Sequence, residues 1–176
     1  EGKAQYLGGG EESYGFLAQD FVRDKDSVSA ISLMAEIAAW AKDKGFDMNA
    51  MLIDIYKTYG YSKEKGISLV RQGKSGAEEI QAIMKQFRAN PPKAIVGSPV
   101  VTVKDYDTLE EKNMITGEVK KLDMPTTSNV LQFFTEDGTK ISIRPSGTEP
   151  KIKFYIEIHD TLNSAEEYDA KNQWAA

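Results

Sequence analysis

The chain has 176 residues, of which 40% are hydrophobic and 28% charged, so it can bury a core and is not expected to be disordered over most of its length. Its 27 acidic and 22 basic residues give a net charge of -5, which argues against nucleic acid as the main partner. The absence of cysteine excludes disulfides, thiolate metal sites and a cysteine nucleophile. It also fits a reducing compartment, so we expect a cytoplasmic location. No apolar run approaches the ~18 residues of a membrane span, so we expect no membrane partner.

The first third of the sequence predicts a loop followed by two helices. A strand-like piece at residues 5–7 leads into residues 8–15, which are too rich in glycine for regular structure and predict a mobile or ligand-facing loop. Apolar residues then recur at helical spacing from an N-cap at Asp26 or Ser27 to Gly45. A second apolar stripe predicts a helix from Met48, capped by Asp47, that ends at Gly60.

The remaining sequence predicts one helix and several strands. We expect a strand at 66–72, and the capping-box spacing from Ser75 to Glu78 predicts a helix that ends at the Asn90-Pro91-Pro92 sequence. Strands are predicted at 99–103, 130–135, 140–144 and from Ile152 onward, where alternation is typical of a half-buried antiparallel strand. The polar tail from Asn163 starts another helix or frays. A helix-rich part and a strand-rich part predict an α+β chain with a boundary near 60–66.

The loop from Arg144 to Lys151 carries the residue types of a phosphate site. Arg144 offers a planar pair of donors for two phosphate oxygens, and Ser146 and Thr148 offer hydroxyls. Gly147 allows backbone amides to turn toward an anion. The segment from Ile141 to Tyr155 has a local charge of about +2, opposite in sign to the whole chain. The alternative is an ordinary solvated hairpin loop, which has the same composition.

The glycine-rich segment from Gly10 to Gly15 is a second candidate site. Its carboxylates, including Glu11, and the hydroxyl of Ser13 can bond to vicinal hydroxyls such as those of a sugar, and the glycines permit close approach. A solvent loop with incidental glutamates is the alternative. The charged run Arg23–Asp26 follows, and it is equally compatible with a solvated segment before the helix N-cap.

Two other features are not assigned as sites. The Gly73-Lys74-Ser75 sequence is similar to the end of a P-loop, but Ser68 stands where that motif requires glycine. His159 is the single histidine, which excludes a site with two imidazoles, and its place at a strand end favours a structural role.

The two loops in this order resemble the α-D-phosphohexomutase superfamily, specifically its phosphoglucomutase/phosphomannomutase and phosphopentomutase-like branch. The resemblance implies that Glu11 and Ser13, with Lys25, bind the sugar, and that Arg144, Ser146, Gly147, Thr148 and Lys151 bind the phosphate that is not transferred. It also implies that residues 1–60 are the C-terminal part of domain 3. Residues 61–176 are then domain 4, with a fold similar to the TATA-box-binding-protein-like superfamily.

Such an enzyme interconverts sugar 1-phosphate and 6-phosphate through a phosphoserine and a bisphosphate intermediate. The family's serine loop and its Mg²⁺-binding Asp-x-Asp-x-Asp loop have no counterpart here, so we expect an inactive C-terminal fragment with no catalytic or metal-binding residue of its own. Mg²⁺ would bind elsewhere in the full-length enzyme, and glucose 1,6-bisphosphate is the implied activator. The implied partners are a phosphosugar and the enzyme's other domains. Phosphopentomutase, or a non-catalytic phosphosugar-binding module, is the alternative.

Overall fold

The computed structural model of the chain describes residues 6–11, 15–21 and 24–174. These residues divide into two compact units, Glu1–Thr58 and Tyr59–Ala176.

Two capped helices form most of the N-terminal unit. α1 (Ser27–Asp43) begins after Asp26, whose carboxylate accepts hydrogen bonds from the N–H groups of Val28 (3.1 Å) and Ser29 (2.7 Å). α2 (Met48–Tyr59) follows Asp47, which accepts a bond from the N–H of Ala50 at 2.6 Å. Carboxylates at these positions satisfy N–H groups that have no partner within the helix. Both helices therefore begin where the sequence predicts.

The glycine-rich segment is not a loop throughout, and this prediction was wrong. β1 (Gly9–Glu11) pairs antiparallel with β2 (Gly15–Leu17) in a two-stranded sheet, whereas Tyr6 and Leu7 are not in a strand. Strand pairing uses backbone groups alone, so glycine weakens it without preventing it. Gly15 has a φ of +142°, and a Cβ there would lie 2.5 Å from the carbonyl of Asp26. Close approach of the hairpin to the start of α1 thus requires this glycine.

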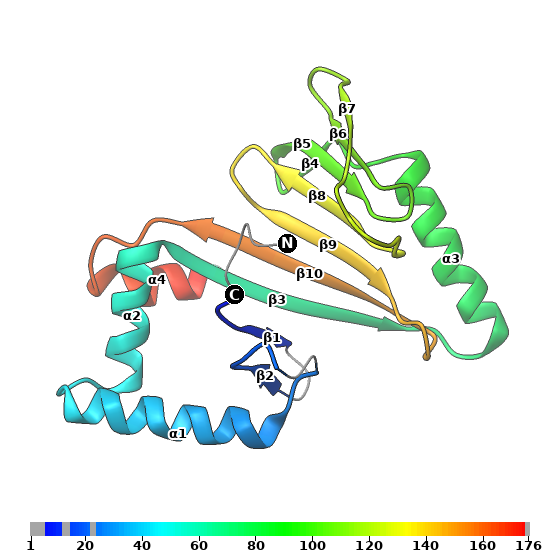
Figure 1. Ribbon diagram of the computed structural model, residues 1–176. Coiled ribbons are helices and arrows are strands. Elements are labelled where there is room, and N and C mark those ends of the chain that lie inside the picture. Colours follow the sequence, from blue (N-terminus) through cyan, green and yellow to red (C-terminus); the bar gives the residue numbers. More distant parts are fainter. Residues whose placement is uncertain (1–5, 12–14, 22–23, 175–176) are drawn as a thin grey trace. The chain divides into compact units, whose positions relative to one another are not determined.

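An antiparallel sheet dominates the C-terminal unit (Figure 1). Its strand order is β3-β10-β9-β8-β5-β6-β7, and β4 pairs with β5 outside this path. The strands are β3 (Tyr61–Val70), β4 (Ala94–Ile95), β5 (Ser98–Asp105), β6 (Glu110–Asn113), β7 (Val119–Lys121), β8 (Leu131–Thr135), β9 (Lys140–Pro145) and β10 (Lys151–Asp160). The prediction of an α+β fold is confirmed. The charged sequences of β6 and β7 lack the apolar alternation that predicts strands, so they were not foreseen.

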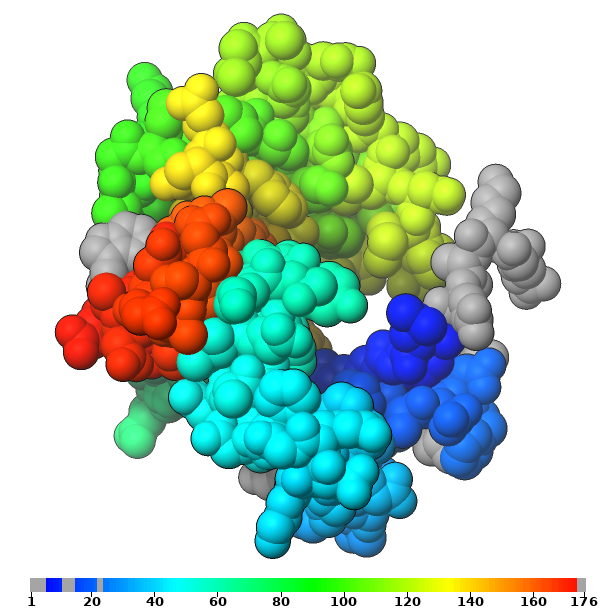
Figure 2. All heavy atoms as spheres, turned by 90° about the vertical axis from the view of Figure 1, so that its left-hand side faces the viewer, coloured from blue at the N-terminus to red at the C-terminus, as the bar shows by residue number. Residues whose placement is uncertain are grey.

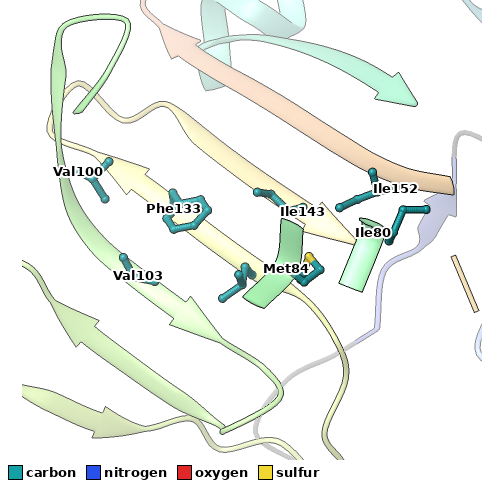
Figure 3. Packing of buried hydrophobic residues seen from close by; sticks show 8 residues of the cluster. Ile80, Met84, Val100, Val103, Phe133, Ile143 and Ile152 are labelled. Atoms are coloured by element: carbon teal, nitrogen blue, oxygen red, sulfur yellow. The ribbon is translucent and has the colours of Figure 1, made fainter. Parts of the chain in front are cut away.

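The core lies between α3 (Gly73–Ala89) and one face of the sheet. Ile80 and Met84 of α3 pack against side chains of the four central strands, as Figure 3 shows. The strand residues of this cluster are Val100, Val103, Leu131, Phe133, Ile143 and Ile152. Because side chains alternate along a strand, the intervening residues of β9 and β10, including Arg144 and Lys153, lie on the opposite face.

Two predicted boundaries in this unit were wrong. β3 begins at Tyr61 rather than residue 66, because its pairing with β10 extends over all ten residues of each strand. α3 begins at Gly73, after an N-cap Gln72 that makes no side-chain capping bond, so Ser75 and Glu78 form no capping box. The helix ends at Ala89, before Asn90 and the two prolines, as the sequence predicts.

The polar tail forms a helix, α4 (Glu166–Trp174), packed beside the end of β10. Lys171 forms an ion pair with Asp160, and the ammonium of Lys63 donates to the backbone oxygen of Asn172 at 2.6 Å. Figure 2 shows the red surface of α4 against the orange end of β10. None of the helices in the described part of the chain is long and apolar enough to cross a membrane.

Candidate phosphate- and sugar-binding site

The predicted phosphate loop connects β9 to β10 and is closed by its own backbone. The N–H of Ser146 donates to the carbonyl of Lys151 at 2.9 Å, which continues the ladder between the two strands. The hydroxyl oxygen of Ser146 accepts bonds from the N–H groups of Thr148 (3.4 Å) and Glu149 (3.2 Å). These two amides therefore already have an acceptor within the loop. An incoming anion would share them with Ser146 or replace its hydroxyl.

β3 and α3 hold this loop from the other side. The N–H of Arg71, which directly follows β3, donates to the carbonyl of Pro150 at 2.8 Å. Gly76, in the first turns of α3, lies so close to Arg71 that a Cβ there would be 2.5 Å from the Arg71 backbone. The loop is thus attached to two elements that are distant from it in the sequence.

Arg144 lies near the end of β9, exposed on the face of the sheet opposite α3. Its guanidinium has no hydrogen-bond or ion-pair partner among the residues that the structure describes. Directly opposite it in the antiparallel register is Lys153 of β10. Like charges at opposed positions repel each other, and an anion bound between them would relieve that repulsion. Lys153 was counted in the local charge but not assigned as a site residue, because only the strand register places it beside Arg144.

Gly147 has no conformational reason to be glycine in this loop. Its φ is outside the left-handed region, and apart from its two chain neighbours no described residue has an atom within 4 Å of the position that a Cβ would occupy. Alanine would therefore fit the loop as it stands. The open space beside Gly147 is available to a ligand.

Lys151 is not free at this site. Its ammonium forms an ion pair with the carboxylate of Glu149, and its N–H donates to the carbonyl of the same residue at 2.7 Å. The hydrogen bond and charge of Lys151, with a smaller effect from Lys153, hold the pKa of Glu149 below its ordinary value. The carboxylate therefore stays ionised at neutral pH.

The predicted sugar-binding residues lie in the N-terminal unit. Glu11 ends β1, opposite Gly15 in the register, and Ser13 lies outside the described residues. Lys25 directly precedes the N-cap of α1, and its ammonium is 3.6 Å from the carboxylate of Asp24. An open pocket of about 200 Å³ lies nearby, lined mainly by apolar groups of β2 and the segment after it, together with Asp24 and Asp26.

Other chemistry-bearing groups are engaged in structural contacts. His159 lies at the end of β10 with its Nε2 2.7 Å from the carboxylate of Glu157, which also pairs with Lys140. No group of three or more histidine, aspartate or glutamate side chains arranged to hold a metal ion occurs within residues 6–11, 15–21 and 24–174.

The large antiparallel sheet, with α3 packed on one of its faces, defines the C-terminal unit as an α+β domain. Two family models match the chain: phosphoglucomutase/phosphomannomutase, C-terminal domain, over residues 68–172, and phosphoglucomutase/phosphomannomutase, alpha/beta/alpha domain III, over residues 1–59. The chain belongs to the phosphoglucomutase/phosphomannomutase family, and the resemblance seen in its two loops is confirmed.

Curated relatives carry the same family name. The chain is 37% identical over 162 residues to a phosphoglucomutase of Staphylococcus saprophyticus, which covers 91% of this chain and 29% of the relative. It is 41% identical over 155 residues to a phosphoglucomutase of Staphylococcus aureus strain USA300, which covers 84% of this chain and 26% of the relative. The chain therefore spans less than a third of the length of these relatives.

A solved structure shares the fold. The open form of pp63/parafusin, a phosphoglucomutase from Paramecium, superposes with a TM-score of 0.50 at 19% identity, covering 90% of this chain and 26% of that one. At this identity the likeness concerns the fold alone.

Proposed function

We propose that this chain supplies the phosphosugar-binding part of a phosphoglucomutase or phosphomannomutase. In this proposal residues 61–176 are domain 4 and residues 1–60 are the C-terminal part of domain 3. Arg144, Ser146, Gly147, Thr148 and Lys151 hold the phosphate that is not being transferred. Lys153, beside Arg144 in the sheet, is a further phosphate ligand. Glu11, Ser13 and Lys25 bind the sugar.

The observation that carries the proposal is the pair of opposed cations beside an open glycine. Arg144 has no partner in the described chain, Lys153 faces it across the strand pair, and the space at Gly147 is empty. A phosphate dianion is opposite in charge to both side chains, and two of its oxygens can accept the paired N–H donors of a guanidinium.

The reaction proposed for the whole protein moves a phosphoryl group between a phosphoserine and either end of the sugar phosphate. One P–O bond to serine breaks as one to a sugar hydroxyl forms, and the reverse step returns the other phosphoryl group to serine. Catalysis of this type depends mainly on positioning and charge neutralisation. Residues of this chain would hold the idle phosphate, and Mg²⁺, bound outside it, would neutralise charge at the transferred group.

Phosphate binding can be tested on the 176-residue chain by ³¹P NMR or calorimetric titration with glucose 6-phosphate. We expect Arg144→Ala to weaken binding about tenfold or more, because a charge-assisted bidentate contact is lost. Gly147→Ala should also weaken binding while leaving the melting temperature within about a degree, since its methyl group fills only open space. Gly66→Ala is the matched control, because a Cβ at Gly66 also meets nothing within 4 Å.

Equal affinities of the wild type and Arg144→Ala for glucose 6-phosphate would contradict the assignment of Arg144 as a phosphate ligand. A loss of stability in Gly147→Ala would show that this glycine serves the fold instead of a ligand.

The chain alone should show no mutase turnover. In a coupled assay with glucose 1-phosphate, Mg²⁺ and glucose 1,6-bisphosphate, we expect product formation at the background rate, because the chain has no counterpart of the family's serine loop. Turnover above background that Arg144→Ala abolishes would contradict the proposal that this chain binds the phosphosugar without catalysing the reaction by itself.

A further inference from the structure

The carboxylate of Glu149 forms an ion pair with one of the cations of the proposed phosphate site. It contacts the ammonium of Lys151, which is one of the groups assigned to phosphate binding. The side chain of Glu149 is 59% exposed, whereas that of Lys151 is 27% exposed. The ion pair thus lies at the loop surface, where an incoming anion can reach it.

The negative charge of Glu149 also weakens the electrostatic attraction of the loop for a dianion. Between Arg144 and Lys153 the loop carries three cations, and Glu149 cancels one of them. Its pKa is lowered by Lys151 and Lys153, so the carboxylate is still charged at the pH at which phosphosugars are dianions. A phosphate that binds here meets a resident negative charge within the same loop.

The backbone of Glu149 explains the loop geometry without the side chain. Its N–H donates to the hydroxyl oxygen of Ser146, and its carbonyl accepts from the N–H of Lys151. Glutamine would retain both bonds. The carboxylate charge is therefore not needed for these two backbone hydrogen bonds.

We propose that Glu149 is a built-in competitor for the phosphate: its carboxylate neutralises Lys151 in the empty loop and exchanges with the phosphate of an incoming phosphosugar. This inference rests on the proposed function. Exchange of one anion for another leaves Lys151 paired in both states, which lowers the net gain from binding and speeds release. A site that must release and rebind the same ligand benefits from such weakened binding.

The test is a double-mutant cycle on the 176-residue chain, titrated with inorganic phosphate and with glucose 6-phosphate at pH 7.5. Glu149→Gln should bind both ligands about three- to tenfold more tightly, with most of the gain in a slower dissociation rate. In a Lys151→Gln background the same substitution should change affinity by less than about twofold, because the cation for which the two anions compete is gone.

Glu136→Gln is the charge-matched control. Glu136 is exposed on the turn before β9, at the opposite end of that strand from the loop, so its removal changes the net charge by the same amount. We expect no change in affinity for this variant.

Each outcome separates the two proposals. Unchanged or weaker phosphate binding by Glu149→Gln, with measurable binding by the wild type, overturns the competitor role alone. An equal gain in Glu136→Gln also overturns it, because the effect would then follow net charge. No detectable binding by the wild type or by Glu149→Gln overturns the proposed function as well.

Discussion

The pKa of Glu157, a residue of the sheet, is set by the side chains around it. Burial raises the pKa of its carboxyl, but hydrogen bonds and charges from Lys140 and His159 outweigh this effect, so the pKa lies below the ordinary value. Glu64 of β3 lies opposite Glu157 in the register, so a second carboxylate faces it across the strand pair. The charged form of Glu157 therefore stabilises the folded state.

Acid should weaken the sheet partly through this residue. A group whose pKa is depressed by folding contributes stability above its unfolded pKa and loses it as the pH falls through the folded value. We expect Glu157→Gln to lower the free energy of unfolding by about 1 kcal/mol at pH 7, because the pair is only partly screened, and by much less at pH 3. Urea denaturation at both pH values measures this. Glu136→Gln should show no such pH-dependent difference, and an equal deficit of Glu157→Gln at both pH values would contradict the argument.

The start of α3 connects an element to the candidate site. Gly76 packs against the backbone of Arg71, and the N–H of Arg71 donates to the carbonyl of Pro150 in the predicted phosphate loop. Helix propensity alone would favour alanine over glycine by up to about 1 kcal/mol. The contact of 2.5 Å that a Cβ would make with the Arg71 backbone is the larger effect.

We therefore expect Gly76→Ala to destabilise the C-terminal unit by about 1–3 kcal/mol, despite its better helix propensity. Chemical shifts of Ser146 and Thr148 in ¹H–¹⁵N spectra should also move, since Arg71 must shift. Gly66→Ala serves as the comparison, because its Cβ meets open space. A more stable Gly76→Ala variant with an unperturbed loop would show that helix propensity is the larger effect.

At the scale of the whole molecule, the two units differ in how much they bury. Among the described residues, the fully buried hydrophobic side chains lie in the C-terminal unit, with the exception of Ala41. On α1, Val28, Ile31 and Met34 are exposed. A unit with few buried apolar groups has little free energy with which to resist local opening.

Hydrogen exchange should therefore distinguish the units. We expect amides of α1 and α2 to exchange at least tenfold faster than those of β8, β9 and β10, measured by mass spectrometry after peptic digestion. Residues of α3 provide an internal reference for a helix that covers a buried core. Equal protection of α1 and α3 would contradict a difference in stability between the units.

Local patterns in the sequence determined where the first two helices begin, how the last strand is oriented and to which family the chain belongs. The caps at Asp26 and Asp47 place the helix starts, and the alternation from Ile152 predicts the orientation of β10, because these effects act over a few residues. The polar composition of residues 144–151 indicates a phosphate loop, and this assignment stays a prediction. The family could be recognised from its two motifs for the same reason.

Only the tertiary structure decided which distant residues meet. Strand register brings Lys153 beside Arg144, and backbone pairing turns the glycine-rich segment into a hairpin against Asp26. The packing of Gly76 on Arg71 attaches α3 to the loop, and the fold of the loop brings Glu149 onto Lys151. Register and close packing depend on the summed fit of several elements, so no local pattern encodes them.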